Sequence, residues 1–111
     1  MTIKSKITKR TLTTLEKITG EKLTFGKLLW AIRMSEEWAQ VEFADKLGIS
    51  KQQLCDLEHD RKSVSPKLAA TYAKKLGFSQ EQFIRLSLQN MLDRAHLAFS
   101  VEILPAATRA M

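Results

Sequence analysis

Two helix signals separated by a single residue constrain the fold more than any other feature of the sequence. The apolar residues Phe43 and Leu47 lie at the spacing of one helical face, and Gly48 follows them directly. Glycine at this position allows the left-handed backbone that ends a helix. Ser50 then begins a Ser-x-x-Gln capping box with Gln53, which predicts the start of a new helix. The chain must therefore turn sharply between two short helices.

The second of these helices has one apolar side and one polar side. Leu54 and Leu57 lie together on the side that faces inward. The opposite side carries Lys51, Gln52, Asp56 and His59. Two short packed helices with a polar second helix are the arrangement of a helix-turn-helix, whose second helix enters the major groove of DNA.

Further helices are expected on both sides of this turn. Capping residues, apolar residues at helical spacing and terminating glycines predict helices over residues 13–20, 24–33, 66–76 and 79–95. The alternation of Phe99, Val101 and Ile103 with polar residues predicts instead a short β-strand over residues 98–104. The expected fold is all-α, a compact bundle of about five short helices containing a helix-turn-helix, with a short C-terminal β-strand.

The length of 111 residues suits one compact domain. Within it we distinguish a basic N-terminal arm with a short helix (1–22), a helix-turn-helix core (23–78) and a C-terminal helix and strand (79–111). Because an unpaired strand leaves backbone donors and acceptors open, we expect two copies to form a homodimer through the C-terminal part. The alternative is that the strand folds back on its own domain, against Ile3 and Ile7.

The charge favours a polyanionic partner. The net charge is +6, and residues 1–22 hold six basic and two acidic residues. The apolar runs are too short to span a membrane, the first residues lack the apolar part of a secretory signal, and Cys55 is the single cysteine. We therefore expect a cytoplasmic protein without a membrane partner.

Catalysis and metal binding find little support in the sequence. No phosphate-binding loop, nucleophile elbow, zinc signature or pair of carboxylates at catalytic spacing occurs, so we expect no enzyme and no cofactor. Cys55 and His59 are four residues apart, with Asp56 and Asp60 nearby, but two good ligands are too few for a metal site.

The residues around the turn resemble the Xre-type, phage lambda repressor-like helix-turn-helix family. The matching run extends from Gln40 to Leu54 and continues with Leu57-Glu58, Arg61-Lys62 and Ser65-Pro66. With the flanking helices, the resemblance covers about residues 24–78. It implies a sequence-specific, repressor-like transcriptional regulator that binds a double-stranded DNA operator as a homodimer through a recognition helix at about residues 51–58.

The resemblance also implies which residues contact DNA. Gln40 matches a glutamine that touches a phosphate and supports the recognition helix, whereas Lys51, Gln52 and Asp56 match positions that reach base edges. The complete expected interface is Gln40, Ser50, Lys51, Gln52, Asp56, His59, Arg61 and Lys62. Lysine, glutamine and aspartate suit guanine, adenine and cytosine respectively, and the residues after the helix suit the sugar-phosphate backbone.

Arg33 and Glu58 match a structural ion pair of the family. The sequence departs from the family pattern in two places. Asp60 replaces a glycine, which aspartate tolerates because it adopts the left-handed conformation more readily than most residues. Ala39 and Trp38 replace the usual capping serine and small apolar residue before Gln40.

Two alternatives to this interpretation remain open. In an arbitrary helix this polar side would be a solvated face, whereas the turn, the cap and the flanking helices favour DNA contact here. Asp56 suits DNA less than its neighbours do, because a carboxylate repels phosphates unless it meets a cytosine or a cation. Proteins of this family and size also include antitoxins, which bind a toxin protein and repress their own operon. The basic residues Lys4, Lys6, Lys9 and Arg10 suit either a protein partner or DNA.

Overall fold

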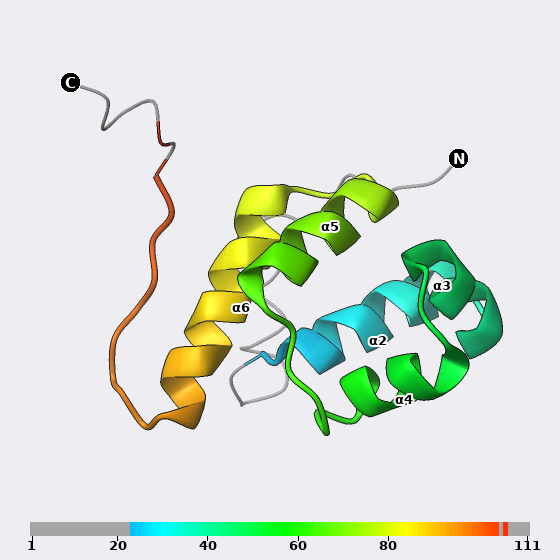
Figure 1. Cartoon of the computed structure of the whole chain (residues 1–111), viewed down its shortest axis with the longest axis horizontal. Coiled ribbons are helices and arrows are strands. Elements are labelled where there is room, and N and C mark those ends of the chain that lie inside the picture. The colour runs from blue at the N-terminus through cyan, green and yellow to red at the C-terminus, as the bar shows by residue number, and fades with distance from the viewer. Residues whose placement is uncertain (1–22, 105, 107–111) are drawn as a thin grey trace.

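The chain folds into a bundle of α-helices, shown in Figure 1. The computed structural model describes residues 23–104 and 106. The helices are α2 (Phe25–Glu36), α3 (Gln40–Leu47), α4 (Lys51–Glu58), α5 (Pro66–Leu76) and α6 (Gln80–Arg94). The expected all-α bundle is therefore correct, and α3 and α4 form the predicted pair of short helices. The expected arm and short helix of residues 1–22 lie outside the described residues.

The helix ends follow the expected capping residues with two differences. Thr24, Ser50, Ser65 and Ser79 each cap the following helix through the side-chain oxygen. The helix from Thr24 runs to Glu36, three residues beyond the expected end, because Glu37 takes the left-handed conformation (φ 58°) that a glycine would normally supply. At α6 the capping box is half formed, since the Oε1 atom of Gln82 is buried without a hydrogen-bond partner.

The predicted C-terminal β-strand is wrong. Residues 97–104 follow α6 without regular structure, and no strand occurs among the described residues. The Gln89 side chain supplies hydrogen-bond partners for two backbone groups of this segment. It donates to the Phe99 carbonyl oxygen at 2.8 Å and accepts from the Val101 amide at 2.9 Å. A strand needs a neighbouring strand to form its ladder, and the described part of the chain offers none. The alternative contact with Ile3 and Ile7 involves residues outside the described part.

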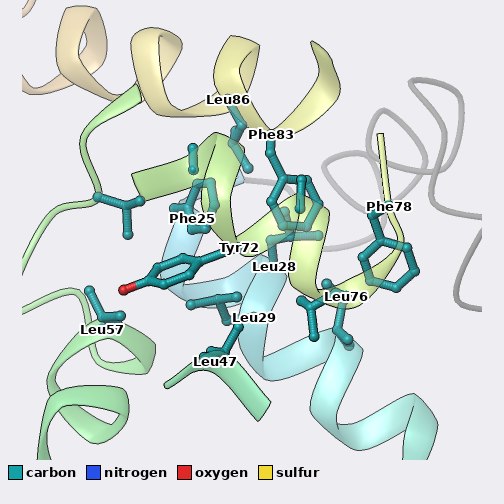
Figure 2. Packing of buried hydrophobic residues seen from close by; sticks show 14 of the residues in the cluster. Phe25, Leu28, Leu29, Leu47, Leu57, Tyr72, Leu76, Phe78, Phe83 and Leu86 are labelled. Carbon is teal, nitrogen blue, oxygen red and sulfur yellow. The ribbon is translucent and has the colours of Figure 1, made fainter. Parts of the chain in front are cut away.

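One apolar core joins the helices. Phe25 of α2 meets Phe83 of α6 edge to face, with ring centroids 5.4 Å apart. Figure 2 shows these rings above Tyr72, Leu29 and Leu47. The buried apolar residues are Leu23, Phe25, Leu28, Leu29, Ile32, Phe43, Ala44, Leu47, Leu54, Leu57, Val64, Ala69, Tyr72, Ala73, Leu76, Phe78, Phe83 and Leu86. The C-terminal helix is thus part of the same core as the helix-turn-helix.

Two buried polar side chains of α6 bind the backbone of other segments. Asn90, 5% exposed, accepts from the Phe25 amide at 2.7 Å and donates to the Leu23 carbonyl oxygen at 3.0 Å. Ser87 donates to the Val64 carbonyl oxygen at 2.7 Å. These bonds supply partners for backbone groups that are buried at the start of α2 and before α5.

Replacing Asn90 tests how far α6 holds the start of α2. We expect Asn90→Ala to lower the free energy of unfolding by about 1–3 kcal/mol, because the buried Phe25 amide loses its acceptor. Urea unfolding followed by circular dichroism measures the change. Gln89→Ala is the matched control, and it should cost less because its partners lie in an exposed segment. Equal costs for the two variants would contradict this role of Asn90.

Candidate nucleic-acid interface

The turn between α3 and α4 is fixed by backbone geometry. Gly48 ends α3 in the left-handed conformation (φ 76°), and its amide donates to the carbonyl oxygens of Ala44 and Asp45. The capping box of α4 is complete: Ser50 Oγ accepts from the Gln53 amide at 3.0 Å, and Gln53 Oε1 accepts from the Ser50 amide at 2.8 Å. The two helices therefore meet at the angle that these two caps impose.

A lysine from α5 supports the same turn. Lys75 Nζ donates to the Leu47 carbonyl oxygen at 3.1 Å, at the C-terminal end of α3, where backbone carbonyl groups lack helical partners. No local sequence signal identifies this contact, because the two residues are 28 positions apart.

Helix α4, the expected recognition helix, presents a polar face to solvent. Leu54 and Leu57 point into the core, whereas Lys51 and Gln52 are exposed and Asp56 is half-buried. Figure 1 shows α4 at the edge of the bundle, next to α2. The residues after the helix, His59, Arg61 and Lys62, are also exposed. The structure thus groups these expected contact residues along one helix and the loop that follows it.

The C-terminal end of α4 is held by a buried carboxylate. Glu58, 8% exposed, accepts from Arg33 Nε at 2.7 Å and from Arg33 Nη2 at 3.0 Å. Gln40 Nε2 also donates to Glu58, at 3.1 Å. The structure therefore brings together the two residues of the expected ion pair and adds Gln40, so that α2, α3 and α4 meet at one side chain.

The start of α3 is arranged without a side-chain cap. Ala39 occupies the N-cap position and makes no capping bond. The preceding residue, Trp38, stacks on Phe43 with ring centroids 5.4 Å apart, and its carbonyl oxygen accepts from Arg33 Nη1 at 3.2 Å. Lys46 Nζ lies 4.8 Å from the centre of the Trp38 ring. Aromatic packing and the Arg33 bond therefore locate the helix that carries Gln40.

Asp60 takes the place of glycine after α4 and adds a contact that glycine lacks. Its backbone is left-handed (φ 59°), and its Oδ2 accepts from Thr24 Oγ1 at 3.1 Å. Gly26 lies close by, where an added Cβ would collide with the Leu57 carbonyl oxygen and the Asp60 carboxylate. The close approach of α2 to the end of α4 thus requires a glycine at 26 and accommodates an aspartate at 60.

Asp56 is bonded to two other residues of the expected contact set. Its Oδ1 accepts from Arg61 Nε at 3.0 Å and from Gln52 Nε2 at 3.1 Å. The hydrogen bond from Arg61 lowers the pKa of the Asp56 carboxyl, and the same bond raises the pKa of Arg61. The carboxylate is therefore ionised, and its charge is paired, at neutral pH.

His59 and Cys55 interact within the last turn of α4. His59 Nδ1 lies 2.8 Å from the Cys55 carbonyl oxygen and 3.6 Å from Cys55 Sγ. The Cys55 carbonyl oxygen also accepts from the His59 amide at 3.1 Å, so the imidazole is a second neighbour of this group. The described residues contain no group of three or more histidine, cysteine, aspartate or glutamate side chains arranged to hold a metal ion.

Comparison with known proteins identifies the same part of the chain. Residues 31–83 match a family model described as helix-turn-helix, a range that contains α3, the turn and α4. No curated protein and no solved structure matches the chain. None of the helices in the described part is both long and apolar enough to cross a bilayer.

The contribution of the Arg33–Glu58 ion pair to the stability of the fold can be tested by substitution. We expect Arg33→Met to lower the free energy of unfolding by about 3–5 kcal/mol, because a buried charge loses its cation. The double variant with Glu58→Leu removes both charges and should recover most of that loss. Denaturant unfolding of the parent, the single variant and the double variant measures both effects. A single variant as stable as the parent would show that the pair does not stabilise the fold.

Proposed function

We propose that the protein is a DNA-binding transcription regulator of the Xre, lambda repressor-like kind that binds a specific operator as a homodimer. The match of residues 31–83 to the helix-turn-helix family model supports this proposal. The observation that carries the proposal is the exposed polar face of α4, held at both ends. The caps at Gly48 and Ser50 fix its start, and the Glu58 carboxylate fixes its end. A rigid helix of this kind suits the major groove.

Side chains at the start of α4 are the proposed base readers. Lys51 and Gln52 are exposed on the first turn, which is the part of a recognition helix that contacts base edges. Lysine donates to guanine O6 and N7, and glutamine pairs with adenine through two hydrogen bonds. Ser50 and Gln53 bond to each other's backbone amides, so their side chains support the helix start.

Side chains at the end of α4 are the proposed backbone contacts. His59, Arg61 and Lys62 are exposed around the C-terminal end of the helix, and two of them carry positive charge at neutral pH. Gln40 lies beside this group through its bond to Glu58. Such contacts set affinity and register, whereas sequence is read by the base contacts. The net charge of +6 favours association with a polyanion.

Operator binding is tested by first selecting bound sites from a random duplex library. On the selected duplex, we expect Gln52→Ala to cost about 1–3 kcal/mol of binding free energy, with little change on random DNA. Lys62→Ala is the matched control, which should weaken binding to all duplexes alike and reduce the salt slope by about one unit. Fluorescence anisotropy titrations at several salt concentrations measure both. Equal losses for Gln52→Ala on selected and random DNA would contradict a base-reading role.

Dimerisation is proposed to use apolar side chains at the C-terminal end, without strand pairing. Met91, Leu97, Phe99 and Leu104 are 50%, 48%, 69% and 64% exposed, respectively. Residues 79–111 hold three basic and three acidic residues, so net charge does not oppose association of two copies there. A two-fold dimer places its recognition helices about 34 Å apart, one turn of DNA, and favours a near-palindromic operator.

The proposed dimer is tested by placing charges on this surface. We expect the double variant Phe99→Asp, Leu104→Asp to be a monomer by light scattering, while its helical circular dichroism is unchanged because both side chains are exposed. Leu68→Asp on α5, where Leu68 is 44% exposed, is the matched control and should keep the oligomeric state of the parent. A charged C-terminal variant that remains dimeric would place the interface elsewhere.

A further inference from the structure

One carboxylate on the exposed face of α4 binds two of the side chains proposed to contact DNA. Asp56 Oδ1 accepts from both Gln52 Nε2 and Arg61 Nε, at 3.1 Å and 3.0 Å. The Arg61 guanidinium also donates from Nη2 to Cys55 Sγ at 3.4 Å. Arg61 is therefore folded back along α4, and the amide of Gln52 is bonded one helical turn along the same face.

We propose that Asp56 is a positioning residue that orients the Gln52 amide for reading adenine and does not itself contact a base. The inference rests on the proposed function, because it concerns how α4 reads the operator. An ionised carboxylate only accepts hydrogen bonds, so the nitrogen of the Gln52 amide, and not its oxygen, must face Asp56. The bond therefore excludes the flipped amide.

The groups of Gln52 that remain after this bond match one base. The amide nitrogen has a second N–H to donate, and Oε1 has lone pairs to accept. In the major groove adenine offers the N7 acceptor and the N6 donor side by side, whereas guanine offers two acceptors, N7 and O6. A glutamine held in one orientation presents its donor and acceptor in one fixed order. Asp56 thus favours adenine at the base pair that Gln52 reads.

Arg61 allows a carboxylate to occupy this position. An unpaired negative charge on a recognition helix repels DNA phosphates, but the guanidinium bonded at 3.0 Å offsets that charge. The same bond lowers the pKa of the Asp56 carboxyl, which keeps the side chain an acceptor at neutral pH. Both bonds are on Oδ1 and hold the carboxylate between Gln52 and Arg61. Its Oδ2 keeps lone pairs, so a cytosine preference is the outcome that the test below must exclude.

Three single variants of the full chain, together with the double variant Gln52→Ala, Asp56→Ala, test the inference on duplexes selected by the parent protein. Asp56→Ala removes the acceptor, Asp56→Asn keeps an acceptor oxygen but removes the charge, and Gln52→Ala removes the proposed reader. Each variant is titrated with the selected duplex, with duplexes substituted at every base pair in turn, and with a random duplex. Circular dichroism melting of each variant verifies the fold.

We expect Asp56→Ala to reduce the preference for adenine at the base pair read by Gln52 by about 2- to 12-fold, the typical effect of releasing one flexible side chain. Preferences at all other base pairs should stay as in the parent. In the Gln52→Ala background, the Asp56→Ala change should have no further effect on base preference. Asp56→Asn should restore only part of the adenine preference, because its amide can accept from or donate to Gln52 and so no longer excludes the flipped amide.

Binding to random DNA provides a second readout that separates charge from positioning. Both Asp56→Ala and Asp56→Asn remove a negative charge and release Arg61 towards phosphates, so both should bind the random duplex more tightly than the parent. The salt slope should steepen by up to about one unit. A carboxylate that only pairs with Arg61 would change the salt slope but leave the base preference as in the parent.

The outcomes distinguish this inference from the proposed function. Loss of a cytosine preference at another base pair in Asp56→Ala would show that Asp56 is a base reader and would overturn the inference. An unchanged base profile in Asp56→Ala would overturn it as well, while specific binding by the parent would still support the proposed function. A parent protein that selects no sequence from the library would instead contradict the proposed function itself.

Discussion

The buried carboxylate of Glu58 is the interaction on which the arrangement of the helix-turn-helix depends. A charge with 2% of its side chain exposed is costly unless cations and donors surround it, so Arg33 from α2 and Gln40 from α3 must both reach it. This requirement fixes the end of α4 against two other helices. The close approach at Gly26 and the bond between Thr24 and Asp60 follow from the same contact of α2 with the end of α4. The orientation of the exposed face of α4 is a consequence of these internal bonds.

The parts of the fold that were predictable from sequence are those set by neighbouring residues. Gly48 and Ser50 specify the turn because a left-handed stop and a capping box act within a few positions. The end of α2 was missed because Glu37, not a glycine, adopts the left-handed conformation. The prediction of a strand over residues 98–104 was wrong because alternation of apolar residues does not reveal whether a partner strand exists. The bonds of Asn90 join residues 65 and 67 positions apart, and no local pattern indicates them.

In the candidate site, too, features set by neighbouring residues were predictable from the sequence, whereas contacts between more distant residues were not. Helical spacing places Lys51 and Gln52 opposite Leu54, and the structure has this arrangement. The resemblance to the family indicated the Arg33 and Glu58 pair, which the structure contains. The contact of Arg61 with Asp56 was not indicated, because Arg61 lies beyond the end of α4 and reaches back through a turn of the backbone. The support of the turn by Lys75 was likewise not visible from the sequence.

The two acidic residues of α4 serve different purposes because their surroundings differ. Glu58 is buried, where attraction between charges is strong and an unpaired charge is costly, so its bonds hold helices together. The pair of Asp56 with Arg61, whose side chain is 53% exposed, lies in a watery environment where such ion pairs contribute little to stability. Breaking this pair therefore costs little free energy, so Arg61 can exchange Asp56 for another partner at the surface. Burial therefore separates two groups of residues on α4 and the loop after it. The buried residues hold the helix-turn-helix together, and the exposed residues are free to meet other molecules.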